Sequence, residues 1–170
     1  RSCLADISEG DKESCEKLMY ALILSGLATQ MAGNSRPASC AEHQISHLWE
    51  LEVLNGPLDA LHGEMISVGT IIVLRKYKSI ARAIREGRCS VRAQWEDDTE
   101  LLEKTFGSRG FLEGIVEENT PDPLLKISPA RLEACLDEIA GLIEELPEEE
   151  ELARMMDRAG CKRSVYEIGL

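Results

Sequence analysis

Apolar residues recur along most of this chain at the three- and four-residue spacing of amphipathic helices. The first such segment follows Asp11, a good helix-capping residue, and continues to Gly33, which can end a helix in the left-handed conformation. A second segment runs from Ser39 or Cys40 to Leu54, before the turn Asn55-Gly56-Pro57. We therefore expect two helices joined by a tight loop.

The third segment is long, from Leu58 to about Arg85, and Pro57 is expected to begin it because its fixed φ suits a first turn. The middle of this segment, residues 66–74, is apolar on all sides, which indicates a helix surrounded by others. Two glycines inside it, Gly63 and Gly69, would allow a neighbouring helix to approach closely.

Weaker helical patterns occupy residues 91–106 and 112–118. A clear one runs from Pro129 to Leu146 with Ser128 as its cap, and a last one from Glu148 to Ala159 precedes Gly160. No alternating strand pattern, internal repeat or low-complexity linker is visible in the sequence. The predicted fold class is all-α, a helical bundle forming a single domain over residues 1–170.

Composition narrows the range of functions. The chain has 170 residues, 44% of them hydrophobic, which suits one domain with a core. Its 19 basic and 31 acidic residues leave a net charge of −12, which argues against nucleic-acid and anionic-membrane partners. No apolar stretch reaches the roughly 18 residues of a spanning helix, and no signal-peptide pattern occurs. Six scattered cysteines without a C-x-x-C pair favour reduced thiols and a cytoplasmic location.

All three histidines of the chain, His43, His47 and His62, fall within one short window. On a helix, His43 and His47 would share a face with their Cβ atoms about 5–6 Å apart, and the turn at 55–57 would fold His62 back toward them. Imidazole is the commonest ligand of transition metals and the usual acid–base group near neutral pH. The alternative is that these are ordinary surface and core histidines. Glu42 and Glu64 could be further ligands, partners of the imidazoles, or plain helix carboxylates.

Several short motifs, in this order and spacing, resemble the sn-glycerol-1-phosphate dehydrogenase family. Each motif is weak alone, and together they extend from about Leu18 to the end of the chain, with residues 89–146 matching only in helical character. The motifs are Ser25-Gly26-Leu27-Ala28, Gly33-Asn34-Ser35-Arg36-Pro37-Ala38-Ser39, Glu42-His43, His47, His62-Gly63-Glu64, and the tail from Met155 to Cys161 and from Glu167 to Leu170. The family shares a superfamily with glycerol dehydrogenase, 3-dehydroquinate synthase and iron-containing alcohol dehydrogenases.

The resemblance implies a helical C-terminal domain whose divalent metal is held by one acidic residue and two histidines. His43 and His62 match those two ligands, and His47 matches a histidine that faces the substrate or relays a proton. The implied metal is zinc, with nickel or iron as alternatives. The superfamily binds NAD(P) in an N-terminal Rossmann-like domain, for which this chain has no glycine-rich motif.

The same resemblance assigns a substrate phosphate to the loop before His43. Arg36 coincides with a basic residue that contacts the anionic group of the substrate in 3-dehydroquinate synthase, and a guanidinium suits a phosphate because it donates two parallel hydrogen bonds. Asn34, Ser35 and Ser39 are expected to donate further bonds. Alternatively, Arg36 pairs with a carboxylate of this acidic protein. Glu64 is expected to orient the ligand imidazoles rather than to touch the metal.

Two departures limit the assignment: the acidic ligand of the family and the glycine-rich motif of its nucleotide-binding domain are both missing from this chain. The acidic ligand of the family lies farther upstream than this chain extends, and Asp6 and Asp11 are too close to His43 to replace it. The chain is therefore expected to be the C-terminal half of an enzyme that interconverts sn-glycerol 1-phosphate and dihydroxyacetone phosphate. We expect it to be inactive by itself, and a homo-oligomer is compatible with this expectation. Other readings are another enzyme of the superfamily, such as a glycerol dehydrogenase or a 3-dehydroquinate synthase-like protein, or a noncatalytic helical module that binds metal or a partner chain.

Overall fold

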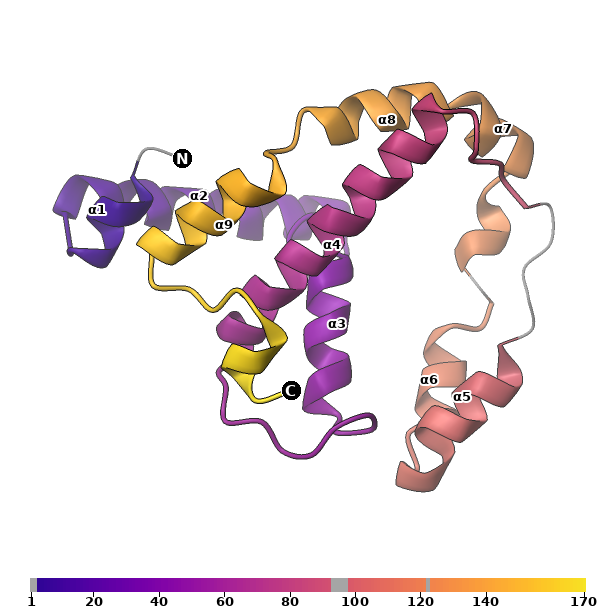
Figure 1. The fold of residues 1–170 in the computed structure, drawn as a ribbon. Coiled ribbons are helices and arrows are strands. Elements are labelled where there is room, and N and C mark those ends of the chain that lie inside the picture. The colour runs from indigo at the N-terminus through magenta and orange to yellow at the C-terminus, as the bar shows by residue number, and fades with distance from the viewer. Residues whose placement is uncertain (1–2, 93–97, 122) are drawn as a thin grey trace. The chain divides into compact units, whose positions relative to one another are not determined.

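The computed structural model describes residues 3–92, 98–121 and 123–170 (Figure 1). Over these residues the regular structure is helical without a strand, which confirms the predicted all-α class. The α-helices are α1 Leu4–Ser8, α2 Lys12–Ala32, α3 Ala41–Glu50, α4 His62–Arg85, α5 Thr99–Phe106, α6 Leu112–Glu118, α7 Pro129–Ala134, α8 Leu136–Glu144 and α9 Glu149–Arg158. Short 3₁₀ helices are η1 Gly107–Arg109, η2 Pro123–Lys126 and η3 Val165–Ile168. None of the described helices is long and apolar enough to cross a membrane.

The chain divides into two compact units. The first comprises residues 1–75 and 147–170, and the second comprises residues 76–146. All three histidines lie in the first unit. The expectation that residues 1–170 form a single domain stays a prediction.

Helix α2 begins and ends where its capping residues predict. The side chain of Asp11 accepts a hydrogen bond from the backbone N–H of Ser14 at 2.8 Å, and this pairs one of the N–H groups that every helix N-terminus leaves free. Gly33 ends the helix at φ 65°, a conformation that costs glycine little. The leucines of α2 remain largely exposed, with Leu22 at 56% and Leu27 at 49%, so this helix adds little to the core.

Helices α3 and α4 are shorter than the pattern predicts. Helix α3 stops at Glu50 instead of Leu54, and α4 starts at His62, so the expected start at Leu58 and the helical role of Pro57 are wrong. The reason is packing, because Leu58 lies in the non-helical connection against the buried core. Asn55 holds this connection to α3 by donating its amide to the carbonyl of Trp49 at 3.2 Å.

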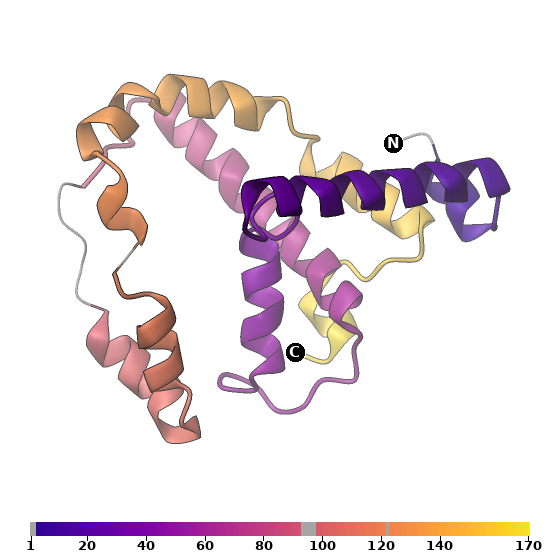
Figure 2. The same ribbon diagram turned by 180° about the vertical axis from the view of Figure 1, so that it is seen from behind.

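The C-terminal segment lies beside the start of α4 (Figure 2). A core next to the histidines joins the two segments. Met65, Val68 and Ile168 are each 5% exposed or less and form one buried cluster. Ser67 donates its hydroxyl to the carbonyl of Lys162, which anchors the C-terminal segment to α4. Residues 65–74 are all buried or half-buried, as expected for a helix enclosed on all sides.

The second unit contains the other differences from the expected helices. The helix predicted from Pro129 to Leu146 is broken at Cys135, whose ψ of 0° departs from the helix, and neither glycine nor proline marks this break in the sequence. Ser128 caps α7 as predicted by accepting from the N–H of Arg131. Helices α6 and α9 agree with the predicted segments to within one residue. Of the helix expected over 91–106, α5 forms the end, and residues 93–97 lie outside the described residues.

Candidate metal centre

One face of α3 carries four polar side chains. Ser46, His47 and Glu50 lie three, four and seven residues after His43, a spacing that places all of them on one side of a helix. Ser46 is fully buried, whereas His43 is half-buried and His47 is exposed. The polar face of α3 therefore carries three groups that can bind a metal ion or a proton, which are His43, His47 and Glu50. It also carries the buried hydroxyl of Ser46.

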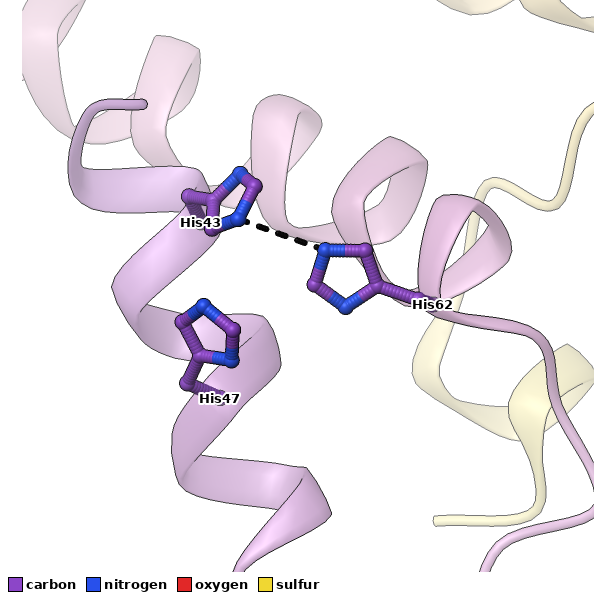
Figure 3. Close-up of side chains that lie close together, drawn as sticks. All are labelled: His43, His47 and His62. Atoms are coloured by element: carbon purple, nitrogen blue, oxygen red, sulfur yellow. Dashed lines mark hydrogen bonds between the residues drawn. The ribbon is translucent and has the colours of Figure 1, made fainter. Parts of the chain in front are cut away.

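The first residue of α4 completes this cluster. His62 lies beside the polar face of α3, with its Nε2 atom 3.3 Å from Nε2 of His43 (Figure 3). The ring centroid of His43 is 4.8 Å from the centroids of both His47 and His62, and the latter two are 5.2 Å apart. The structure thus brings together the three histidines that the sequence singled out.

A close contact between backbones holds the two helices in this register. A Cβ atom placed on Gly69 of α4 would lie 2.8 Å from the carbonyl oxygen of Glu42, the residue before His43. Only glycine leaves room for such an approach. The close approach expected at Gly69 is confirmed, whereas a Cβ atom on Gly63 would meet nothing within 4 Å.

Glu50 joins two of the imidazoles. Its Oε1 atom lies 2.7 Å from Nδ1 of His62, and its Oε2 atom lies 2.8 Å from Nδ1 of His47. Burial raises the pKa of Glu50, but the hydrogen bonds from His47 and His62 outweigh it and hold the pKa below its ordinary value. The carboxylate therefore stays ionised and accepts a hydrogen bond from each ring.

The three histidines fit a transition-metal ion. One ligand atom from each lies within 4.8 Å of the others. A tetrahedral ion with metal–nitrogen bonds of about 2.0–2.1 Å holds two ligand nitrogens about 3.3–3.4 Å apart, which agrees with the 3.3 Å between His43 and His62. The donor set is all nitrogen, which suits zinc, nickel or iron better than calcium or magnesium.

The loop before α3 exposes the residues expected to bind a phosphate. Asn34, Ser35 and Arg36 are exposed, and Ser39 is half-buried. Asn34 shapes the loop by accepting from the N–H of Arg36 at 3.0 Å. Among the described residues, no carboxylate forms an ion pair with the Arg36 guanidinium, so the side chain keeps its donors for another partner.

Glu64 lies close to the cluster but bonds elsewhere. Its carboxylate accepts from the backbone N–H of Leu61 at 2.8 Å, which supports the start of α4. Glu42 likewise accepts from the N–H of Cys40 at 3.2 Å. The carboxylate that bonds to the imidazoles is Glu50, which none of the sequence motifs includes. Its position three residues after His47 was a usable signal.

These observations define a helical protein with a three-histidine candidate metal centre at the junction of two helices. The chain is similar in sequence to glycerol-1-phosphate dehydrogenases, as its motifs predicted. It is 28% identical over 168 residues to the glycerol-1-phosphate dehydrogenase (NAD(P)+) of Geobacillus thermodenitrificans. This alignment covers 98% of this chain and 34% of that protein. The enzyme of the same name from Pyrococcus furiosus is 48% identical over 77 residues, covering 45% of this chain and 21% of that protein.

A third relative agrees with these two. The glycerol-1-phosphate dehydrogenase (NAD(P)+) of Thermococcus kodakarensis is 50% identical over 64 residues, covering 38% of this chain and 17% of that protein. The chain thus spans about a third of the length of the Geobacillus thermodenitrificans relative. No protein-family model matches it, and no solved structure does.

Proposed function

We propose that this chain is the metal- and substrate-binding part of an NAD(P)-dependent dehydrogenase that interconverts sn-glycerol 1-phosphate and dihydroxyacetone phosphate. The observation that carries the proposal is the 3.3 Å approach of His43 and His62 in a chain similar over 98% of its length to such an enzyme. The nicotinamide cofactor would bind to a part of the protein outside these 170 residues.

In this proposal, His43 and His62 hold the metal through their Nε2 atoms. A divalent metal bound there would act as a Lewis acid on the carbonyl of dihydroxyacetone phosphate. The position of the pair supports this role, because both rings are half-buried and yet border the exposed ring of His47. A substrate could therefore reach the site from the side of His47.

His47 is the proposed proton donor and acceptor at the substrate oxygen. Its Nδ1 atom bonds to Glu50, so its Nε2 atom remains for the substrate or for an ordered water. An imidazole is suited to this exchange because its ordinary pKa, about 6.5, lies near neutrality.

Arg36 is the proposed anchor of the substrate phosphate, assisted by Asn34, Ser35 and Ser39. Its exposed guanidinium can donate two parallel hydrogen bonds to phosphate oxygens. In a chain with a net charge of −12, such a cation also offsets the general repulsion of an anionic substrate.

The experiment measures binding of dihydroxyacetone phosphate to the Zn²⁺-loaded chain by calorimetry, with unphosphorylated dihydroxyacetone in parallel. We expect binding of the phosphorylated ketone to require Zn²⁺ and to weaken by at least about tenfold in Arg36→Ala, because a charged hydrogen bond contributes about 1.5–3 kcal/mol. Arg154→Ala is the control, since Arg154 is also an exposed arginine of the first unit.

Two outcomes would contradict the proposal. Equal binding of both ketones would favour a glycerol dehydrogenase-like substrate without a phosphate. Zn²⁺ binding without affinity for either ketone would favour a noncatalytic metal-binding module. The chain alone is expected not to oxidise NADH or NADPH with dihydroxyacetone phosphate.

A further inference from the structure

We propose that Glu50 is a positioning residue that places the protons of His47 and His62 on their Nδ1 atoms and so turns both Nε2 atoms toward one shared site. This inference rests on the proposed function in one respect, because the shared site is the proposed metal centre together with the substrate position beside it. The placement of the protons itself does not depend on a metal.

The hydrogen-bonding chemistry of Glu50 leads to this assignment. An ionised carboxylate has only acceptor atoms, so a ring nitrogen that bonds to it must carry the hydrogen. The two oxygens of Glu50 lie 2.7 Å and 2.8 Å from the Nδ1 atoms of His62 and His47. In each neutral ring the other nitrogen, Nε2, then keeps its lone pair.

The freed lone pairs are directed to the centre of the cluster. Nε2 of His62 is the atom that lies 3.3 Å from Nε2 of His43 (Figure 3), whereas Glu50 bonds to the other ring nitrogen, Nδ1. A carboxylate bonded to the far nitrogen of a metal-ligating imidazole fixes the orientation of the ring and raises its basicity. The Glu50 side chain therefore orients two of the three imidazoles by bonding to their Nδ1 atoms. No other described carboxylate does so.

The surroundings of Glu50 support a fixed geometry. The Oγ atom of Ser46, one residue earlier than His47 and fully buried, lies 3.1 Å from the same Nδ1 atom of His62. Ser46, His47 and Glu50 all lie on one face of α3, so a single rigid element holds both Nδ1 partners of His62. The side chain of Glu50 is 35% exposed, which leaves room for an isosteric replacement without disturbing the core.

The test uses Glu50→Gln, which has the same shape but offers one acceptor oxygen in place of two. The single amide oxygen can accept a hydrogen bond from only one imidazole, and the amide NH2 group then faces the other imidazole as a donor. We therefore expect Zn²⁺ affinity to fall about 10–100-fold. Calorimetric titration of the metal-free chain measures this change. Circular dichroism and the thermal midpoint are expected to remain those of the unsubstituted chain.

Glu42→Gln is the matched control. It removes a negative charge from the same helix, one residue before His43, but Glu42 bonds to the N–H of Cys40 and not to a ring. We expect Zn²⁺ affinity in this variant to stay within about twofold of the unsubstituted chain, because exposed charges at longer range are largely screened by salt. An equal loss in both variants would overturn the proposal, since charge alone would then explain it.

A second readout does not involve the metal. Imidazole ¹⁵N shifts of the metal-free chain at pH 8, above the ordinary imidazole pKa of about 6.5, report which nitrogen carries the proton. We expect Nδ1–H forms for His47 and His62, with at least one of them converted in Glu50→Gln. Unchanged ring protonation in Glu50→Gln would overturn the proposal. If the unsubstituted chain binds no Zn²⁺, the proposed metal function fails, and the ¹⁵N shifts still decide the role of Glu50.

Discussion

The Nε2 atoms of His43 and His62 lie 3.3 Å apart, although the two residues belong to different helices and are separated by 19 positions in the chain. Two neutral imidazoles can approach this closely through a hydrogen bond or through a shared metal ion. The 3.3 Å separation is also the distance between two ligands of tetrahedral zinc, about 3.3–3.4 Å.

Replacement of either member of the pair is expected to weaken metal binding more than replacement of His47. We expect His43→Ala and His62→Ala each to lower Zn²⁺ affinity by more than about tenfold, because losing a ligand costs at least as much as losing the partner of a ligand. His47→Ala is expected to have a smaller effect, since the exposed ring is assigned to the substrate. Calorimetric titration of the three variants measures this order. The largest loss in His47→Ala would identify it as a ligand instead.

Gly69→Ala is expected to separate α3 from α4. The added Cβ atom would lie 2.8 Å from the carbonyl oxygen of Glu42, which is a backbone atom that cannot rotate away. Such overpacking costs about 1–3 kcal/mol of unfolding free energy and is also expected to weaken Zn²⁺ binding by moving His43. Urea unfolding and metal titration measure the two effects.

Gly63→Ala is the matched control for this variant. It lies on the same helix next to His62, but its Cβ atom would meet nothing within 4 Å. We expect stability to be unchanged or higher by up to about 1 kcal/mol, because alanine favours a helix more than glycine does. Equal destabilisation by the two substitutions would contradict the contact at Gly69.

Ile168→Ala is expected to destabilise the first unit through the core beside the histidines. Ile168 is 1% exposed and packs against Met65 and Val68, one turn and two turns into α4. Removal of a buried isoleucine side chain costs about 2–5 kcal/mol. Tyr166→Ala in the same 3₁₀ helix should change stability by less than about 0.5 kcal/mol, because Tyr166 is 86% exposed. Urea midpoints that fall equally in both variants would exclude this explanation.

The carboxylate of Glu167 is expected to make stability depend on pH. Hydrogen bonds from the backbone N–H groups of Arg163 and Ser164 hold the pKa of Glu167 below its ordinary value. A carboxyl group whose pKa is lower in the folded state stabilises the fold above its unfolded pKa, and this contribution is lost as the pH falls through the folded pKa. The stability difference between the unsubstituted chain and Glu167→Gln should therefore be present at pH 7 and shrink on acidification.

Urea unfolding at pH 7 and at pH 3 measures that difference. Glu145→Gln is the control, because Glu145 is exposed and no hydrogen bond to its carboxylate occurs among the described residues. A difference for Glu167→Gln that is the same at both pH values would rule out ionisation as the cause.

The local sequence determined the helical class, the ends of α2 and the identity of the three histidines. These features depend on nearby residues: the bond from Ser14 to Asp11, the left-handed conformation of Gly33, and the apolar spacing along each helix. Propensity and spacing were not enough at Cys135, where α7 ends without glycine or proline, or at Leu58 and Ala60, which pack on the core instead of joining α4.

The tertiary structure alone decided how the site is built. The role of Gly69 depends on the backbone of Glu42 lying against it, and the role of Glu50 depends on His62 arriving from the next helix. Contacts of this kind join residues that are far apart in sequence, so no local pattern specifies their distances. The sequence by itself therefore supplied the chemical groups of the centre, and the packing of α3 on α4 determined which atoms of those groups face one another.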